Sequence, residues 1–355
     1  MDYCYNLALM IRDRQVKGRR EQLARVMSKS GISWLLSLMP AKDSLLVLTY
    51  HRIGDAESDP WNPAIISAGA EEFDEQISYL KRKHALVTLE EALAFVDGTE
   101  KDDGKRCRVL ITFDDGYLDN YEIAFPILKS YGAQGVFFLC SDIVGSGHIP
   151  WWDHIAYLVR SGNKTKFSLS FPQPLHVDIE KDGLSESLRQ IFNLFKTPEK
   201  VDMDRSIGEL KEAVGGKEPP NNMRRYLTWD EAREMLAGGM AIGAHTHTHA
   251  MLSKLSEDEQ RREMKLSRDI IGENLGITVE SLAYPFGSRM SFTKKTEQIA
   301  EEIGFRGAFS YYGNMTNQRE NLERYNLKRV TVGSQSGIRM KVQTETGRVC
   351  GTFWP

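Results

Sequence analysis

Val109-Leu-Ile-Thr-Phe-Asp-Asp-Gly-Tyr117 is the stretch of sequence that decides the fold. Its first five residues, Val109 to Phe113, are apolar or β-branched and include no breaker, which predicts a buried strand. Two adjacent carboxylates, Asp114 and Asp115, then end the strand. Aspartates form strands poorly and neighbouring charges repel each other, so the pair is unfavourable unless a cation or a substrate uses it. An ordinary strand-to-turn exit is the alternative, because Asp-Gly is a common turn pair.

A second polar segment, Gly243-Ala-His-Thr-His-Thr-His249, follows another short apolar run, Met240 to Ile242. It holds three histidines within five residues. Neutral imidazole suits zinc and its neighbours, and two histidines with one carboxylate leave the open coordination position that a hydrolytic metal needs. A solvated polar turn is the alternative. Taken together with Asp114 and Asp115, the segment predicts a metal site.

The two segments together resemble the signature motifs of the polysaccharide deacetylases, also called the NodB-homology or carbohydrate esterase family 4 group. Thr112-Phe-Asp-Asp-Gly116 and His245-Thr-x-x-His249 are similar to the first two motifs, and Tyr284-Pro-Phe-Gly287 is similar to the third. The resemblance covers Leu45 to Val332. It implies an α/β fold, a distorted (β/α)7-type barrel with an inserted subregion. In that fold a divalent metal binds at the C-terminal ends of the strands, and N-acetyl groups are removed from amino sugars.

The resemblance also implies a role for each polar residue of these motifs. Asp115, His245 and His249 are the implied metal ligands, with zinc as the expected metal, and Asp114 is the implied general base. One branch of the family takes its catalytic imidazole from a Tyr-His pair near the start of the domain. This sequence has no histidine after His249. His51, which follows an early strand and a tyrosine, is therefore expected to protonate the leaving nitrogen.

Four further residues are expected to line the substrate. The backbone N–H near Tyr117 is expected to assist at the oxyanion. Pro285 and Phe286 belong to the third motif. Trp152 could stack on a sugar ring, although tryptophans more often pack in a core.

The third motif departs from the family pattern. Ala283 stands where the family has an arginine that orients the base aspartate. Arg52, Arg289 or Arg329 could replace that arginine from another strand, and the sequence does not choose among them. His247 is left out of the metal set, because its alternate spacing points it away from the ion that its neighbours share, toward outer support or solvent.

The chain is expected to comprise an N-terminal basic and helical extension at 1–44, a barrel at 45–332 with an insertion at 141–226, and a C-terminal tail at 333–355. The segment from Arg12 to Lys29 is rich in arginine and lysine. A solvated helical face packed on the barrel is favoured for it. An amphipathic segment resting on an anionic membrane surface is the alternative.

Local signals place several elements of the barrel. One helix is expected from Tyr121 to Tyr131 with a kink at Pro126. Later strands are expected at Phe305–Phe309 and Arg324–Val332. Three further helices begin at capping boxes, which start at Thr88, Thr228 and Ser256.

Composition limits the class of protein. A chain of 355 residues with a net charge of −3 can bury a large core and has no global attraction for nucleic acid. The four cysteines are scattered, with no CxxC pair and no disulfide-type spacing, which is compatible with a reducing compartment. The first residues lack a signal-peptide pattern, and no run reaches the ~18 apolar residues of a membrane span. A cytoplasmic location is therefore expected.

For a cytoplasmic protein the expected partner is an amino-sugar glycan or a lipid- or nucleotide-linked precursor of one. The leading interpretation is a metal-dependent de-N-acetylase. The alternatives are a hydrolase that cleaves another amide or an O-acetyl ester at the same metal, and a non-catalytic carbohydrate-binding protein that contains a metal. Asp114 argues against the last alternative, because a pure binding site has no use for an uncoordinated carboxylate beside its metal.

Overall fold

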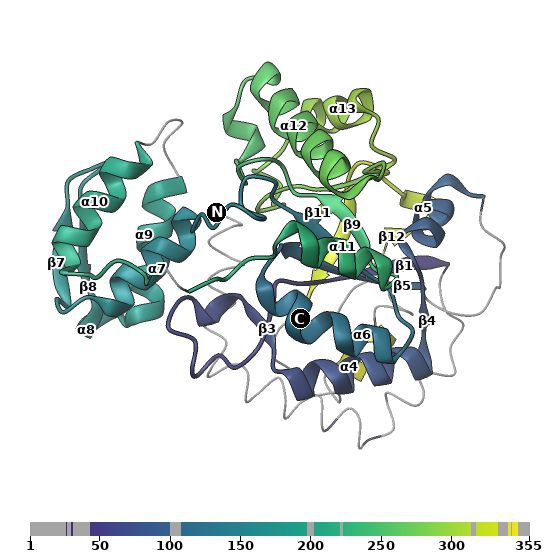
Figure 1. Cartoon of the computed structure of the whole chain (residues 1–355), viewed down its shortest axis with the longest axis horizontal. Coiled ribbons are helices and arrows are strands. Elements are labelled where there is room, and N and C mark those ends of the chain that lie inside the picture. Colours follow the sequence, from purple (N-terminus) through teal and green to yellow (C-terminus); the bar gives the residue numbers. More distant parts are fainter. Residues whose placement is uncertain are drawn as a thin grey trace. The chain divides into compact units, whose positions relative to one another are not determined.

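Seven parallel strands close into a barrel in the computed structural model of this protein (Figure 1). The ring closes because the first strand pairs in parallel with the last barrel strand on one side and with the Asp-Asp strand on the other. The predicted (β/α)7-type barrel is confirmed. In ring order the strands are β1 (Ser44–Tyr50), β13 (Leu327–Thr331), β11 (Gly307–Gly313), β10 (Ser281–Ala283), β9 (Ala241–Ala244), β6 (Gly135–Leu139) and β5 (Arg108–Asp115).

The structure describes most of the chain, in several stretches. These are residues 26, 30, 43–99, 108–196, 202–220, 223–313, 317–332, 340–341 and 343–346. The described residues form two compact units. The barrel belongs to the larger unit, and the described part of the smaller unit consists of Asp55–Ile65 and Gly147–Arg225.

Strand β5 lies in the barrel wall with all eight residues buried. It pairs with β1 from Leu45↔Arg108 to Tyr50↔Phe113, and with β6 on its other side. The ring of Phe113 stacks on that of Phe137, with centroids 4.6 Å apart and an interplanar angle of 11°. An apolar, β-branched strand with neighbours on both sides satisfies its backbone and buries both faces. This is why the Asp-Asp pair sits at the tip of a rigid element.

Short strands flank the ring. β4 (Ala85–Leu86) adds to β5 in parallel, and β12 (Asn317–Gln318) adds to β1 in antiparallel fashion. A separate parallel pair is formed by β2 (Arg52–Ile53) and β3 (Ile66–Ala68). The first described segment of the smaller unit, Asp55–Ile65, comes between these two strands in the sequence.

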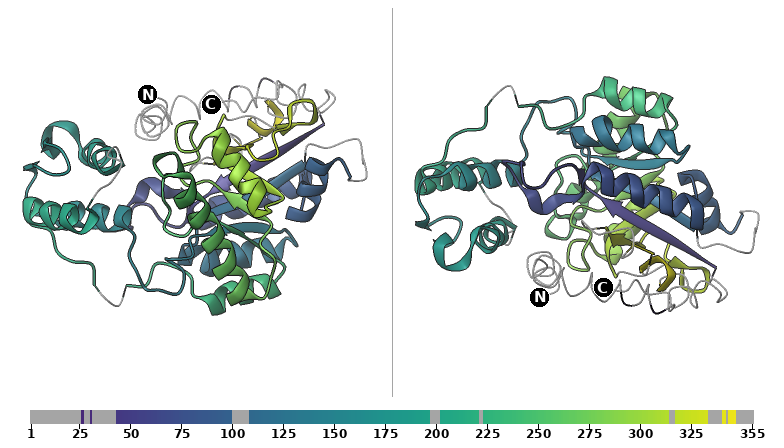
Figure 2. Two further views of the ribbon diagram at one scale, coloured as in Figure 1. Left: turned by 90° about the horizontal axis from the view of Figure 1, so that it is seen from above. Right: turned by 90° about the horizontal axis from the view of Figure 1, so that it is seen from below.

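Helices cover the outside of the barrel, with α4 and α6 on one side and α12 and α13 on the other (Figure 2). The three predicted capping boxes are present, at Thr88, Thr228 and Ser256. Each places a hydroxyl on the N3 amide and a glutamate on the cap amide, so two exposed donors at the helix start are satisfied. The helices are α4 (Ala70–Lys83), α5 (Leu89–Asp97), α6 (Phe125–Ser130), α11 (Trp229–Ala237), α12 (Glu257–Leu275) and α13 (Lys294–Ile303), with 3-10 turns at Leu252–Lys254 and Arg319–Asn321.

The helix expected from Tyr121 to Tyr131 differs from the prediction. A π-helical turn spans Asn120–Ala124, and a regular helix follows only from Phe125. Pro126 therefore lies in the first turn of α6, where its missing N–H is not needed. The proline ends the irregular turn instead of kinking a continuous helix.

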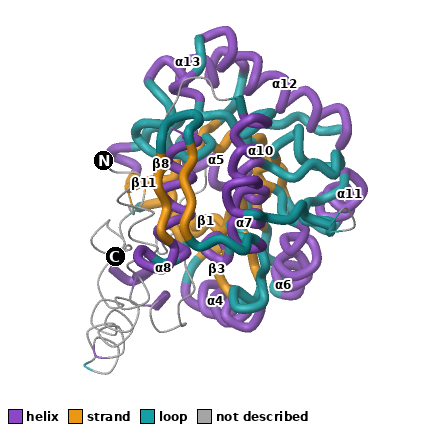
Figure 3. The backbone as a smooth tube through the Cα atoms, turned by 90° about the vertical axis from the view of Figure 1, so that its left-hand side faces the viewer, coloured by secondary structure: helices purple, strands orange, loops and turns teal. Residues whose placement is uncertain are grey.

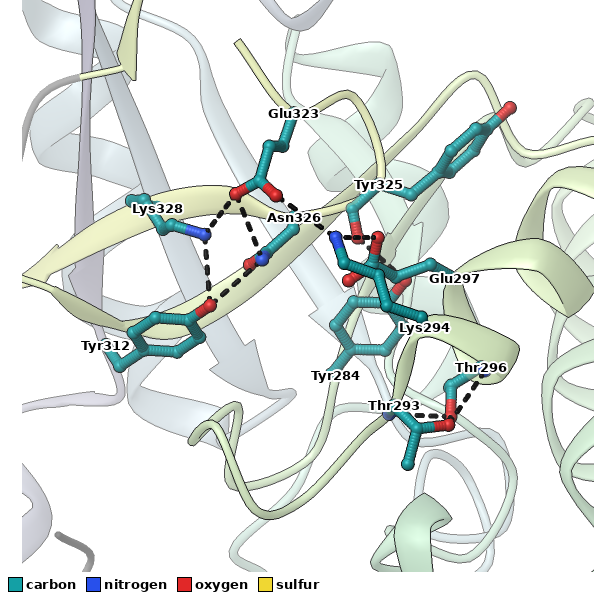
Figure 4. Close-up of polar contacts among 10 residues, drawn as sticks. All are labelled: Tyr284, Thr293, Lys294, Thr296, Glu297, Tyr312, Glu323, Tyr325, Asn326 and Lys328. Carbon is teal, nitrogen blue, oxygen red and sulfur yellow. Dashed lines mark hydrogen bonds and ion pairs between the residues drawn. The ribbon is translucent and has the colours of Figure 1, made fainter. Parts of the chain in front are cut away.

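Strand β11 starts and ends later than the predicted Phe305–Phe309. It reaches Gly313, with a register shift against β13 between Phe309 and Gly313. A polar cluster holds this extension (Figure 4): the Tyr312 hydroxyl accepts hydrogen bonds from Asn326 Nδ2 at 2.9 Å and Lys328 Nζ at 3.0 Å. Lys328 also pairs with Glu323 at 2.8 Å. The residues that make these contacts lie outside the apolar run from which the strand was predicted, so that run did not indicate how far the strand extends.

The smaller unit has an apolar core of its own. Its antiparallel β7–β8 hairpin, drawn in orange in Figure 3, packs through β7 against α10 and through β8 against α9. Arg225 lies in its interior, with Nε 2.9 Å from Asp153 Oδ2 and the guanidinium over the ring of Trp61. The elements are a 3-10 turn (Pro63–Ile65), α7 (Trp151–Ser161), β7 (Lys166–Leu169), β8 (Leu175–Asp178), α8 (Ile179–Asp182), α9 (Leu184–Lys196) and α10 (Met203–Val214).

Two predictions about the chain ends fall largely outside the described residues. The basic segment from Arg12 to Lys29 is one, and most of the tail at 333–355 is the other. Among the residues that the structure describes, none of the helices combines the length and the apolar character needed to cross a membrane.

Candidate functional site

The polar residues predicted to act together lie where the parallel strands of the barrel end. Asp114 and Asp115 close β5, and His51 directly follows β1. His245 directly follows β9. Because all seven strands run in one direction, their carboxyl ends lie on one face of the barrel, which is where such barrels carry their functional groups.

Asp115 takes an unusual backbone conformation at the strand end. Its φ is +76°, in the left-handed region, and the next residue, Gly116, has φ +78°. A non-glycine residue there costs about 1–2 kcal/mol. Thr246, His249 and Phe286 also have positive φ, between 57° and 63°. Backbone strain of this kind gathers at sites whose side chains must be aimed in one direction.

The two predicted histidine ligands face the same carboxylate oxygen. His245 Nε2 lies 3.5 Å from Asp115 Oδ1, and His249 Nε2 lies 3.4 Å from that same atom. His245 Nδ1 donates to the carbonyl oxygen of Ala283 at 2.8 Å, which leaves Nε2 for the centre of the site. A backbone carbonyl behind a ligand histidine fixes its tautomer and ring orientation. Ala283 thus serves this cluster through its backbone.

The distance from each histidine to Asp115 suits donors that share a divalent metal ion. Asp115 Oδ1 is buried and faces only the two imidazole nitrogens among the described residues, at distances longer than an ordinary hydrogen bond, so a cation held between these atoms would satisfy it. Zinc binds oxygen and nitrogen donors at ~2.1 Å, so in a tetrahedral site those donors lie about 3.4 Å apart. The two distances to Asp115 Oδ1 match that spacing.

Charge in the cluster is balanced between the carboxylate and the imidazoles. Burial raises the pKa of Asp115, but the neighbouring His245 and His249 outweigh it and hold that pKa below its ordinary value. Burial lowers the pKa of His245, while Asp114 and Asp115 shift it the other way, and the net direction is upward. A divalent ion bound there would add positive charge beside both carboxylates.

Cys140 is a neighbour of this cluster that the sequence analysis missed. Donor atoms of Asp115, Cys140 and His245 all lie within 4.8 Å of one another, so these three could also hold a metal ion. The thiol donates to the backbone carbonyl of His245 at 3.3 Å. Burial, with Asp115 and Asp114 nearby, raises the pKa of the Cys140 thiol well above its ordinary range. Cys140 could have been found from the register of β6 against β9. This register pairs Leu139 with Ala244, so the next residues, Cys140 and His245, lie opposite each other.

Asp114 is held by an arginine from the last barrel strand. Arg329 Nη1 and Nη2 each donate to one Asp114 oxygen at 2.7 Å, and the pair is buried. Arg329 Nε donates to the carbonyl of Ser310 at 2.8 Å. Burial raises the pKa of Asp114, but the Arg329 guanidinium outweighs it and keeps the pKa below its ordinary value. Of the three candidate arginines, Arg329 is the one that meets Asp114.

The other two candidate arginines lie elsewhere. Arg52 Nε donates to Asp119 at 2.8 Å and its guanidinium lies over the ring of Tyr117. Arg289 lies over the ring of Tyr312. Both therefore have partners away from the base aspartate.

His51 packs against Tyr311, another residue that the sequence analysis did not single out. The two rings meet edge to face with centroids 5.4 Å apart, and the Arg329 guanidinium lies 5.7 Å from the Tyr311 ring centroid. Neither ring nitrogen of His51 makes a hydrogen bond to any residue that the structure describes, whereas its backbone is held by Ser67 and Asn120. The charge of His51 contributes to the lowered pKa of Asp114 and of Asp115.

The third motif supports the histidines from the side. The Phe286 ring lies 4.9 Å from that of His249, and Pro285 is buried. Gly287 has φ +52°, and a Cβ atom there would come within 2.4 Å of the backbone nitrogen and Cβ of Tyr311. Only glycine allows these two backbones to approach so closely.

Tyr117 is fully buried, so its side chain is a packing group. Its ring stacks on that of Tyr226, with centroids 4.7 Å apart. The predicted oxyanion role concerned the backbone N–H near this residue, and it remains a prediction.

The side chains of His247 and Trp152 have partners other than the residues of the cluster. His247 Nδ1 shares a hydrogen bond with the Ser141 hydroxyl at 2.9 Å, and its Nε2 lies 3.9 Å from Asp142. Trp152 belongs to the smaller unit, where it packs against that unit's core and meets the Trp151 ring edge to face. A sugar contact by Trp152 remains a prediction.

Comparison with known sequences identifies a family. The sequence profile of the polysaccharide deacetylases matches residues 101–308. YxkH of Bacillus subtilis, whose assigned name is that of a polysaccharide deacetylase, is 22% identical over 275 positions, which cover 77% of this chain and 66% of that protein. A poly-beta-1,6-N-acetyl-D-glucosamine N-deacetylase of Staphylococcus epidermidis is 30% identical over an alignment of 174 positions, which covers 39% of this chain and 58% of that protein. The chain thus spans less than two thirds of the length of both relatives.

Solved structures share the fold. A Streptococcus pyogenes deacetylase, PplD, determined in complex with acetate, has a TM-score of 0.56 at 20% identity over 86% of this chain and 99% of its own. IcaB from Ammonifex degensii has a TM-score of 0.55 at 22% identity over 86% of this chain and 98% of its own. At this level of identity the likeness shows a shared fold and nothing more.

Proposed function

The chain belongs to the polysaccharide deacetylase family, and we propose that it removes N-acetyl groups from an amino-sugar glycan or a precursor of one, by hydrolysis at a divalent metal. One observation carries this proposal. His245 Nε2 and His249 Nε2 both face one buried oxygen of Asp115, while the neighbouring Asp114 stays outside that cluster and is paired with Arg329. A metal-binding carboxylate and a separate, ionised carboxylate at adjacent positions suit amide hydrolysis.

Asp115, His245 and His249 would hold the ion, and zinc suits this set of one oxygen and two nitrogen donors. Bound there, a divalent cation supplies a more acidic water molecule and a polarised carbonyl group. Cys140 lies close enough to influence which metal is preferred, because a sulfur donor favours softer ions.

Asp114 is proposed as the general base. Arg329 occupies one lone pair on each of its oxygens, and each carboxylate oxygen keeps a second lone pair that can accept a proton from water. The lowered pKa keeps Asp114 ionised at neutral pH, so it is ready to accept. The bidentate contact also fixes the plane of the carboxylate.

His51 is proposed as the acid that protonates the leaving nitrogen. Its ring is half-buried beside Tyr311, and both ring nitrogens are left for the substrate among the described residues. In this reaction, water gives a proton to Asp114 and the water oxygen bonds to the acetyl carbon. The carbon–nitrogen bond then breaks as His51 gives a proton to nitrogen, which releases acetate and a free amine.

The similarity to the Staphylococcus epidermidis protein supports N-acetylglucosamine as the sugar type to try first. We propose β-1,6-linked N-acetylglucosamine oligomers as the first test substrate and lipid- or nucleotide-linked N-acetylglucosamine as the second. A cytoplasmic location also remains a proposal, and fractionation of cells that make the native protein would test it.

The decisive experiment measures acetate and free amine from these substrates with zinc-loaded protein, and metal content in parallel. We expect Asp115→Asn to lose zinc and Asp114→Asn to keep zinc but lose activity by roughly 100-fold or more. His51→Gln should keep zinc and lower kcat. His247→Gln is the matched control, because its ring contacts Ser141 away from the cluster, and it should behave like the wild type.

Release of acetate without amine would indicate an O-acetyl esterase instead. If fully zinc-loaded protein released no acetate from any of these substrates, the proposed function would be wrong. Equal zinc content in wild type and Asp115→Asn would refute the proposed ligand set.

A further inference from the structure

Glu263 of helix α12 contacts the segment from His245 to His249, which we call the histidine loop. Its Oε2 accepts hydrogen bonds from the backbone N–H groups of His247 at 3.0 Å and Thr248 at 2.9 Å. Its Oε1 accepts from the Thr248 hydroxyl at 2.9 Å. Three donors from two consecutive loop residues thus meet one carboxylate.

The sequence of α12 places this carboxylate at the loop. Gln260, Met264 and Ser267 of the helix are buried against the barrel, and Glu263 stands at the edge of that buried stripe. The helix start is anchored by the Ser256 cap, so the position of Glu263 along the loop is set.

The histidine loop needs such an anchor because its backbone is strained. Thr246 and His249 both have left-handed backbones, and they bracket the two residues that Glu263 holds. On its other side the loop is hydrogen-bonded to the residues that follow Cys140. Ser141 N donates to Thr246 O at 3.4 Å, and Asp142 N donates to His247 O at 3.0 Å. Glu263 completes the support from the helix side.

We propose that Glu263 is a positioning residue for the metal site: its carboxylate holds the histidine loop in the conformation that aims His249 at Asp115. This inference rests on the proposed function, in which His249 is a ligand. Hydrogen bonds to an ionised acceptor are stronger than neutral ones. Without them the loop is free to relax toward ordinary backbone angles, which turns His249 away from the shared oxygen.

The test measures zinc affinity, kcat and KM for Glu263→Ala, Glu263→Gln and Glu263→Asp. We expect Glu263→Ala to weaken zinc binding by about 10- to 100-fold, as is typical when support behind a metal ligand is lost. Glutamine can accept from both amides and donate to the Thr248 hydroxyl, so Glu263→Gln should fall closer to the wild type. At saturating zinc the loss should appear in kcat, with KM little changed.

Glu273→Ala is the matched control, because Glu273 is an exposed glutamate on the same helix, away from the loop. It should bind zinc like the wild type. The melting temperature of each zinc-free variant separates a positioning effect from a loss of fold, since positioning weakens zinc binding in a protein that melts normally.

The outcomes separate the two proposals. If wild-type protein binds zinc and Glu263→Ala binds it equally well, the positioning role is wrong and the deacetylase proposal stands. If the wild type itself binds no metal, the deacetylase proposal fails first. Should Glu263→Ala not fold, Glu263→Asp and Thr248→Val decide, because both keep the helix and shorten or remove one contact; wild-type zinc affinity in both would overturn the inference.

Discussion

Replacement of Arg329 by methionine is the sharpest test of how this site works. Methionine has a similar length and no charge, so the Asp114 carboxylate stays buried but loses the two 2.7 Å bonds that compensate its burial. The desolvation that the guanidinium outweighs in the wild type is then opposed only by the weaker influence of His245 and His51. We expect the pKa of Asp114 to move from below its ordinary value to above it.

The size of the effect follows from the burial of the pair. Arg329 and Asp114 are both nearly inaccessible to solvent, and removing one partner of a buried ion pair costs about 3–5 kcal/mol of folding free energy. Part of that cost returns when Asp114 takes up a proton, because the neutral acid is cheaper to bury. At neutral pH we therefore expect a loss of roughly 3 kcal/mol, and a fall in kcat/KM of roughly 100-fold as the base becomes protonated.

The pH dependence has a defined sign. In the wild type the lowered pKa means that ionised Asp114 stabilises the fold above its unfolded pKa, near 3.8, and that this contribution fades as the pH falls below it. In Arg329→Met the folded pKa is raised, so the ionised form is the one that is penalised. The stability difference between the two proteins should be largest at neutral pH and should shrink toward pH 3.

Two assays measure this prediction. Urea unfolding at several pH values gives the stability difference, and initial rates of acetate release between pH 4 and 9 give the acid limb of the activity profile. Arg306→Met is a suitable control, because Arg306 joins three carboxylates at the surface and is partly exposed. It should alter stability modestly and leave the acid limb in place. An Arg329→Met protein with a wild-type acid limb would refute the assigned coupling between Arg329 and Asp114.

Two further predictions concern packing and charge. Gly287→Ala should lower the free energy of unfolding by ~3 kcal/mol in chemical denaturation, because the new Cβ meets the Tyr311 backbone at a positive φ. Gly276→Ala is the control: its φ is +67° but the space around it is open, so it should cost only ~1 kcal/mol. Equal losses in the two variants would contradict the close approach of Gly287 to Tyr311. Lys196→Met should raise the free energy of unfolding at pH 7 by ~1–3 kcal/mol, because burial lowers the pKa of Lys196 from 10.5 to about 8. Since the folded protein disfavours the protonated amine, this gain should shrink as the pH rises from 8 to 10.5, and a pH-independent gain would point to packing alone.

Much of the barrel could be predicted from local patterns. The run from Val109 to Phe113 is a strand because its residues are β-branched or apolar, and the capping boxes at Thr88, Thr228 and Ser256 begin helices because they satisfy exposed amides. The meeting of Asp115 with His245 and His249 followed from strand ends that share one face. The family resemblance, which the profile match confirms, supplied the expected partners.

The remaining parts of the site depend on contacts between distant segments. Arg329 lies within the last barrel strand. The sequence does not choose among Arg329, Arg52 and Arg289, because it does not show which of the three side chains reaches Asp114. Cys140 and Glu263 reach the histidine loop through the register of β6 against β9 and the rotation of α12 about its axis. Neither quantity leaves a local pattern in the sequence. The π-helical turn at Asn120–Ala124 escaped notice for a similar reason, since its residues resemble those of an ordinary helix.

The described part of the smaller unit comes from two separated segments of the chain, and this has a consequence for synthesis on the ribosome. Of these two segments Asp55–Ile65 is made first, and its partners Tyr157 and Arg225 are made only after Ile66–Ser146. At ~5–20 residues per second this interval lasts roughly 4 to 16 s. During that time Trp61, later covered by Arg225 and Tyr157, stays exposed on a nascent chain whose first barrel strands are already available for pairing. We therefore expect slower translation over this interval to lengthen the exposure of Trp61 and to lower the yield of correctly folded protein.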